Sequence, residues 1–285
     1  MLKRMTRSLA WVTLMVMVAG CAGPARISFP NATPSGPVAI SAETYRPEGR
    51  GPFPAVVLLH GCEGVSANSH RWARWLRDRG YVALVVDSWT PRGLKETCTF
   101  TVPDPPNTAR FDDAVGALRY LHGLPEVARG RVGIMGWSNG GVFSMAVVNG
   151  PSLERARARA VVMPEPGFAA AIGVYPGACD SLMHERFVRP VLVVIGAADD
   201  WIRAETCVEM AETMRAKGAD VWTEVLPGAH HFFDFEGMAK TVLPEVGNDN
   251  KPGGCCGATV AYDAAANERA HRRVAEFFGY HLRAR

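Results

Sequence analysis

The segment RVGIMGWSNGGVFSMA, residues 131–146, decides how the rest of the chain is interpreted. It begins as a short apolar run, typical of a strand buried on both faces, and continues as a helix-like run. Between the two runs, Gly136, Ser138 and Gly140 form a Gly-x-Ser-x-Gly pattern. A serine on a sharp strand-to-helix turn takes a strained backbone conformation, and a Cβ two residues before or after it would crowd the turn. An ordinary glycine-rich turn is the alternative, but the flanking strand and helix favour a nucleophile elbow that exposes the Ser138 hydroxyl beside free helix N–H groups.

Apolar runs expected to form strands alternate with runs expected to form helices. The strand segments are 54–59, 81–86, 169–175, 191–195 and 220–226, with a loosely alternating edge strand at 38–45. The helix segments are 68–79, 109–121, 205–217 and 264–282, while the polar and then proline-rich residues 153–167 are assigned to the surface. This alternation predicts an α/β fold with a doubly wound, mostly parallel sheet flanked by helices, whose chemistry lies beyond the carboxyl ends of the strands.

The composition is that of a globular protein, with 285 residues of which 48% are hydrophobic and 21% charged. This length allows one large α/β domain or two small ones. The net charge is +3, and Lys3, Arg4 and Arg7 account for it, so the remainder is near neutral and no nucleic-acid partner is indicated. No cofactor or metal is expected, because the sequence has no P-loop, no dinucleotide-binding glycine pattern after a strand and no His-x-x-x-His pair with an acid.

The N-terminus has the features of a bacterial lipoprotein signal peptide. Basic residues precede an apolar run at 9–18 that is too short to span a bilayer comfortably, and the run ends VAGC. Cleavage before Cys21 would leave its thiol for diacylglyceryl attachment, whereas an ordinary secretory signal would be cut near Gly23. By resemblance to envelope lipoproteins, Ala22 indicates the periplasmic face of the outer membrane. We expect a signal peptide at 1–20, a tether rich in Pro, Ala, Ser and Gly at 21–36, and the folded domain at 37–285.

Export to an oxidising compartment would permit disulfides among the six cysteines that remain besides Cys21. We expect at least one disulfide among Cys62, Cys98, Cys179 and Cys207, because the first two follow strand ends near the same face and the last two follow strands expected to be neighbours. Four buried free thiols are the alternative. The adjacent pair at 255–256 favours two outside partners or free thiols over pairing with itself.

Three residue types that form a nucleophilic triad follow predicted strand ends. Ser138, Asp199 and His231 come in the chain order Ser, Asp, His that belongs to α/β-hydrolases. A serine hydroxyl is a poor nucleophile until a histidine takes its proton, and a carboxylate fixes the tautomer of that histidine. Taken singly, the aspartate could be a helix cap and the histidine structural. Together with the elbow, the three residues predict nucleophilic catalysis.

Several segments together resemble the dienelactone hydrolase family of α/β-hydrolases. They are LHGCEG at 59–64, VDSWTPRG at 86–93, GWSNGG at 136–141, GVYPG at 173–177, GAADD at 196–200 and PGAHHFFD at 227–234. The resemblance spans roughly residues 40 to 282. It implies a sheet of about eight strands and hydrolysis of a small-molecule ester or lactone, a reaction that needs no cofactor. The domain at 37–285 is therefore expected to be an α/β-hydrolase domain.

The resemblance also assigns roles to individual residues. It makes Asp199 the acid and His231 the base, with Asp200 and His230 as the runners-up. It places the oxyanion hole at the backbone N–H groups of Cys62 and Asn139. Neighbouring side chains in an extended loop point to opposite sides, so only one of the two adjacent histidines is expected to face Ser138.

The sequence departs from the family pattern at two places. The nucleophile is Ser138 where the enzymes that give the family its name have a cysteine. Gly61 follows His60 where those enzymes have a glutamate, and Glu63 comes later. The expected function is thus an envelope-associated serine hydrolase that cleaves a carboxylic ester or lactone through an acyl-enzyme on Ser138. An acyltransferase or peptidase with the same triad, or a ligand-binding lipoprotein on a hydrolase scaffold, remains an alternative.

Overall fold

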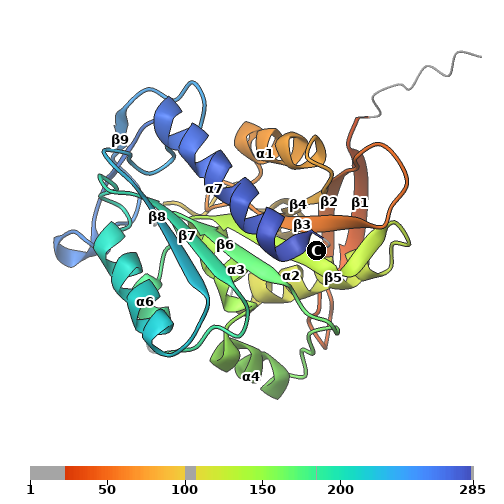
Figure 1. The fold of residues 1–285 in the computed structure, drawn as a ribbon. Helices are drawn as coiled ribbons and strands as arrows, with labels where there is room; N and C mark the ends of the chain where they lie inside the picture. Colours follow the sequence, from red (N-terminus) through yellow and green to blue (C-terminus); the bar gives the residue numbers. More distant parts are fainter. Residues whose placement is uncertain (1–22, 100–106, 184, 284–285) are drawn as a thin grey trace, which may run out of the picture.

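The computed structural model describes residues 23–99, 107–183 and 185–283, and it is built around one large sheet (Figure 1). Eight strands lie in the order β1-β2-β4-β3-β5-β6-β7-β8. Their bounds are β1 Ala25–Pro30, β2 Ala39–Tyr45, β3 Phe53–Leu59, β4 Val82–Asp87, β5 Val127–Trp137, β6 Ala170–Val174, β7 Val191–Gly196 and β8 Val221–Leu226. β1 and β2 are antiparallel to each other, and β2 is antiparallel to β4. All further neighbours in the order, β4-β3-β5-β6-β7-β8, pair in parallel. The predicted mostly parallel sheet of eight strands is confirmed.

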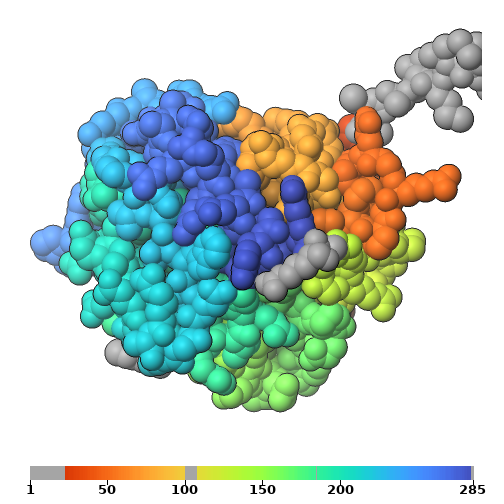
Figure 2. All heavy atoms as spheres, viewed as in Figure 1, coloured from red at the N-terminus to blue at the C-terminus, as the bar shows by residue number. Residues whose placement is uncertain are grey.

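Helices cover both faces of the sheet. The helices are α1 Ala67–Arg77, α2 Asn107–His122, α3 Asn139–Ala146, α4 Gly150–Ala158, α5 Cys179–Leu182, α6 Ala204–Ala216 and α7 Ala264–Leu282, with 3-10 turns η1 Thr90–Arg92 and η2 Pro252–Gly254. In Figure 1, α1 and α7 lie in front of the sheet and α2 and α3 lie behind it. Figure 2 shows α7 filling the surface between α1 and the segment around β8, so this face of the sheet is closed.

The central strands are apolar runs because both of their faces are covered. Every residue of β6 and β7 is buried, as expected for parallel strands between two helical layers. The close approach of α7 to β5 depends on Gly133. A Cβ at this position would lie 2.8 Å from Leu282 Cδ1 and 2.9 Å from Phe278 Cε1. The C-terminal helix and the strand that carries the nucleophile motif therefore pack as one unit.

The structure corrects three details of the sequence-based description. The predicted tether at 21–36 contains β1, which pairs with β2. This strand buries Phe29, while its neighbours Ser28 and Pro30 are exposed. The segment at 153–167 lies largely at the surface as predicted, but its first residues belong to α4, whose N-cap Asn149 accepts a hydrogen bond from Ser152 N at 3.0 Å. A small antiparallel sheet of β9, Thr241–Leu243, and β10, Ala258–Val260, follows β8.

Two disulfides cross-link segments that follow the carboxyl ends of the parallel strands, one between two loops and one between α5 and α6. Cys62 is bonded to Cys98, and Cys179 is bonded to Cys207, which confirms the expected cross-link. The first closes a separation of 36 residues and, in chain-entropy terms, such a bond is worth about 4 kcal/mol. The structure pairs Cys255 with Cys256, contrary to the expectation from sequence. The other four cysteines of the described residues are already bonded to one another, which leaves no outside partner among them.

No helix in the described part of the chain is long and apolar enough to cross a membrane. The predicted signal peptide and Cys21 lie outside the described residues.

Candidate active site

The nucleophile motif forms the predicted elbow between β5 and α3. Ser138 has φ 47° and ψ −116°, a conformation that few non-glycine residues adopt, and α3 begins at the next residue. A Cβ on Gly136 would collide with Gly140 O, and a Cβ on Gly140 would collide with Leu59 O. Both glycines are therefore required by the close approach of the turn to itself and to β3. The backbone N–H of Ser138 donates to Val174 O at 2.9 Å, which anchors the elbow to the end of β6.

Asp199 and His231 form a buried pair at the ends of β7 and β8. His231 Nδ1 lies 2.7 Å from Asp199 Oδ2, and neither side chain has solvent-exposed area. The other oxygen, Asp199 Oδ1, accepts from the backbone N–H groups of Trp201 and Ile202 at 2.9 Å each. A carboxylate opposite Nδ1 holds the proton on that nitrogen, so Nε2 presents its lone pair. The structure thus brings together the aspartate and the histidine that the sequence selected.

The imidazole of His231 lies beside the end of β6, where the Ser138 elbow is anchored. His231 Nε2 is buried and has no hydrogen-bond partner among the described residues. The imidazole packs 4.3 Å from the ring of Tyr175, the residue directly after Val174, and 4.8 Å from the ring of Trp201. The His231 ring and the Ser138 elbow thus both lie against the end of β6. Of the runners-up, Asp200 instead binds Thr259, through the backbone N–H at 2.7 Å and the hydroxyl at 2.8 Å, and His230 does not share the Asp199 contact.

The two predicted oxyanion donors follow the ends of two neighbouring strands, β3 and β5. β3 and β5 are parallel and pair Leu59 with Gly136. Cys62 and Asn139 each come three residues after that pair. The N–H of Asn139 is the first of α3, and such groups have no partner within the helix. The carbonyl of Cys62 is held by Thr97 N at 2.8 Å and Trp89 Nε1 at 3.0 Å.

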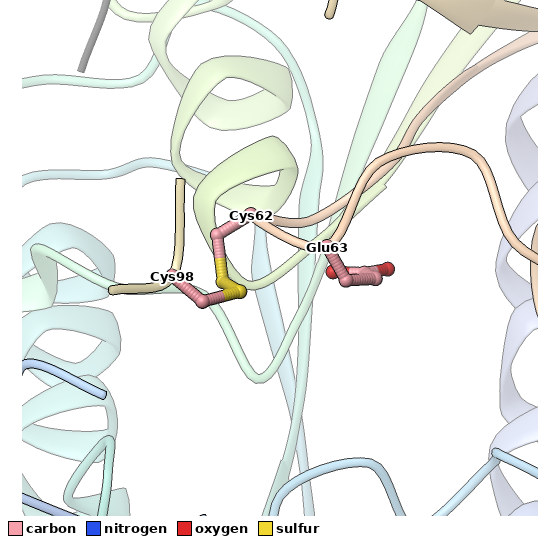
Figure 3. Close-up of side chains that lie close together, drawn as sticks. All are labelled: Cys62, Glu63 and Cys98. Atoms are coloured by element: carbon pink, nitrogen blue, oxygen red, sulfur yellow. A yellow bond between two sulfur atoms is a disulfide. The ribbon is translucent and has the colours of Figure 1, made fainter. Parts of the chain in front are cut away.

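Glu63 is a carboxyl group at the site to which the sequence assigned no role. Burial raises its pKa to about 7, although the charges of His231 and Arg110 act in the opposite direction. Its Oε2 atom is buried and has no hydrogen-bond partner among the described residues. Figure 3 shows Glu63 directly after Cys62 on the same loop, with its side chain to one side of the Cys62–Cys98 bond. A glutamate just after a buried strand is the only signal in the sequence, and it does not reveal the burial.

We predict that Glu63 lowers the free energy of unfolding as the pH rises from about 4.5 to about 7. The pKa is higher in the folded than in the unfolded state, so the folded state binds more protons in this interval and loses stability as they dissociate. Urea unfolding of wild type and Glu63→Gln at both ends of the interval measures this. The variant should gain stability relative to wild type as the pH rises, and a constant difference would contradict the prediction.

The described residues contain one cluster with the spacing of a metal site. Ligand atoms of Cys62, Glu63 and Cys98 all lie within 4.8 Å of one another (Figure 3). The two sulfurs are bonded to each other, so neither is the thiolate that a metal would need. The cluster is therefore a disulfide beside a glutamate.

A buried carboxylate, Asp234, connects the elbow to the histidine loop. Its Oδ2 accepts from Asn68 Nδ2 at 2.9 Å and from the indole N–H groups of Trp72 and Trp137 at 2.8 Å each. Its Oδ1 accepts from the hydroxyl of Tyr175 at 2.7 Å. Trp137 precedes Ser138 and Tyr175 packs on His231, so one carboxylate holds a neighbour of each residue. No local sequence pattern indicates this network, because its members are far apart along the chain.

Comparisons with known proteins agree with this geometry. Residues 40–282 match the model of the dienelactone hydrolase family. The chain is 24% identical over 193 residues to a Bradyrhizobium protein described as a probable 2-oxo-3-(5-oxofuran-2-ylidene)propanoate lactonase, with 66% of this chain and 76% of the relative covered.

Two solved structures have the same fold. A dienelactone hydrolase-like promiscuous phosphotriesterase from metagenomic libraries superposes with a TM-score of 0.64 at 20% identity, covering 92% of this chain and 100% of the other. Esterase 2 of Thermogutta terrifontis, phosphorylated by paraoxon, superposes with a TM-score of 0.61 at 18% identity, covering 90% of this chain and 95% of the other. The family match spans most of the chain. It includes β5, which leads into the Ser138 elbow, and β7, which leads into the Asp199 loop. The chain belongs to the dienelactone hydrolase family, within the α/β-hydrolase superfamily, and is a carboxylic ester hydrolase.

Proposed function

We propose that the enzyme cleaves a carboxylic ester or lactone through a covalent acyl-enzyme on Ser138. The observation that carries the proposal is the buried Asp199–His231 pair, whose free Nε2 lies at the end of β6 where the Ser138 elbow is anchored. A serine becomes nucleophilic when such a histidine accepts its proton. The order and strand-end positions of the three residues support the same conclusion.

In the proposed mechanism, His231 Nε2 takes the hydroxyl proton as Ser138 Oγ attacks the carbonyl carbon of the substrate. The N–H groups of Cys62 and Asn139 stabilise the oxyanion of the tetrahedral intermediate. The imidazolium, stabilised by Asp199, then gives its proton to the leaving alcohol oxygen, and the acyl-enzyme forms. Water attacks the acyl-enzyme with His231 again acting as the base, which releases the acid and restores Ser138.

We expect a fluorophosphonate probe to label the protein at Ser138, because the activated hydroxyl displaces fluoride to form a stable phosphonyl ester. Intact mass and peptide mapping would locate the adduct, with Ser138→Ala as the variant and Ser144→Ala as the matched control. Ser144 is a serine within α3, close to Ser138 in the chain, but its hydroxyl is held by Gly141 O and Ile172 O. Labelling that survives Ser138→Ala would refute the proposed nucleophile. A panel of esters and lactones with the same variants then defines the substrate class.

We further propose that the enzyme is anchored to the cell envelope by a lipid on Cys21. The support is the basic residues, the short apolar run and the VAGC sequence before the folded domain. Ala22, the residue after the cysteine, supports an anchor at the periplasmic face of the outer membrane.

We expect the protein extracted from membranes to be heavier than the chain from Cys21 by a diacylglyceryl group. Intact-mass measurement tests this directly. Cys21→Ser should release the protein into the soluble fraction once it is processed. A variant that still partitions entirely with membranes would count against the anchor.

A further inference from the structure

Arg110, in the first turn of α2, is a buried cation with 1% of its surface exposed. Its Nη1 donates to Asn139 Oδ1 at 2.6 Å, and its Nη2 donates to the carbonyl oxygen of His60 at 2.7 Å. The guanidinium carbon lies 4.7 Å from the centre of the Trp89 ring. Arginine suits this position because its rigid planar fork can donate to two separate acceptors while it stacks on an aromatic face. A lysine ammonium would have to serve both acceptors from a single nitrogen.

The partners of Arg110 belong to the two segments that carry the proposed oxyanion donors. Asn139 supplies one donor from its own backbone. His60 begins the segment after β3 that supplies the other donor at Cys62. Trp89, on which the guanidinium stacks, donates its indole N–H to Cys62 O at 3.0 Å. Arg110 therefore connects the loop after β3 with the start of α3.

The ring of His60 fixes the peptide group that carries the Cys62 N–H. His60 Nε2 lies 3.1 Å from Ser88 N, and a backbone N–H can only donate, so Nε2 is the acceptor. The proton is then on Nδ1, which donates to Gly61 O at 2.7 Å. Gly61 O and Cys62 N belong to one planar peptide group, in which C=O and N–H point in opposite directions. Holding the oxygen thus sets the direction of the N–H.

This arrangement requires a neutral imidazole, because a protonated ring would present a second N–H to Ser88. Burial, together with the charges of Arg110 and Arg92, lowers the pKa of His60 well below its usual value. Arg110 therefore acts on both donors. It binds the side-chain oxygen of Asn139 and the backbone carbonyl of His60. Its charge also helps to keep the His60 ring neutral.

We propose that Arg110 is a positioning residue that aligns the backbone N–H groups of Cys62 and Asn139 into one oxyanion hole. It acts through Asn139 and His60 and does not touch the substrate. The inference rests on the proposed function, since it concerns the stabilisation of the tetrahedral intermediate formed at Ser138.

The test compares Arg110→Met with wild type on a carboxylic ester and on its thionoester, in which sulfur replaces the carbonyl oxygen. Sulfur is larger and a weaker hydrogen-bond acceptor, so an aligned oxyanion hole favours the oxygen substrate. We expect kcat for the ester to fall roughly 10- to 100-fold, with KM changed less than about threefold. The ratio of ester to thionoester kcat/KM should fall about tenfold, and Arg110→Lys should give an intermediate ratio.

Arg159→Met is the matched control. Arg159 pairs with Asp112 of the same helix α2, at 2.9 Å, without contact to either oxyanion segment. Its loss removes an arginine ion pair from α2, and the ratio should stay at the wild-type value. A folded Arg110→Met protein with an unchanged ratio would overturn the inference.

A second variant keeps the inference testable if Arg110→Met does not fold. Asn139→Ala removes one acceptor of Arg110 but keeps the backbone N–H, so its ratio should fall in the same direction. In combination with Arg110→Lys, the two effects should be less than additive, because they act on one interaction. An unchanged ratio in Asn139→Ala would overturn the inference. Ester hydrolysis that survives Ser138→Ala would instead overturn the proposed function, and this inference with it.

Discussion

His231→Ala is expected to lower kcat for ester hydrolysis by at least about a thousandfold. The imidazole is the group that must take the proton from Ser138, and its pairing with Asp199 at 2.7 Å leaves Nε2 as the basic atom. Without it, only the oxyanion hole and substrate binding would contribute to catalysis. Steady-state kinetics on a chromogenic short-chain ester measures the loss.

The neighbouring histidine provides the control for this prediction. His230 is not bonded to Asp199, so His230→Ala should keep most of the activity. Both variants remove the same side chain from the same loop, so a general disturbance of the loop would affect them equally. The reverse ranking would show that His230 is the base, while the hydrolase assignment would stand.

Asp234→Ala is expected to lower the free energy of unfolding by about 3 kcal/mol or more. The carboxylate accepts four hydrogen bonds from side chains of Asn68, Trp72, Trp137 and Tyr175. Its removal leaves buried donors without an acceptor, and each such group costs about 1–3 kcal/mol. Equilibrium urea unfolding measures the change.

Asp220→Ala is the matched control for Asp234→Ala. Asp220 also accepts an indole N–H, from Trp222 at 2.9 Å, but this hydrogen bond is exposed. The control should therefore change the stability by less than about 0.5 kcal/mol. Equal effects of the two variants would show that the network around Asp234 does not stabilise the core. We also expect Asp234→Ala to lower kcat, because Trp137 and Tyr175 flank the nucleophile and the base.

The sequence predicted the parts of the site that depend on local pattern. A buried parallel strand is recognisable as an apolar run, and the turn at Ser138 requires glycines at fixed positions. The chain order of Asp199 and His231 then placed them at strand ends, where the structure pairs them. These features are encoded within short segments, so they need no knowledge of the tertiary contacts.

The remaining features depend on which distant segments meet. Asp234 lies 166 residues from Asn68, and nothing in the local sequence distinguishes a buried acceptor from a surface aspartate. The perturbed pKa of Glu63 results from burial by other segments, which a local pattern does not show. β1 was missed because it is short and lies in a stretch rich in proline, alanine and serine, where only Ile27 and Phe29 alternate with polar or exposed neighbours.

The position of β1 limits how far the enzyme can reach from a lipid anchor. The strand begins at Ala25, four residues after Cys21. An extended chain spans at most about 3.6 Å per residue, so the edge of the sheet would stay within about 14 Å of an acylated Cys21. The folded domain would then stay close to the membrane surface, and substrates that partition to that surface would be within its reach.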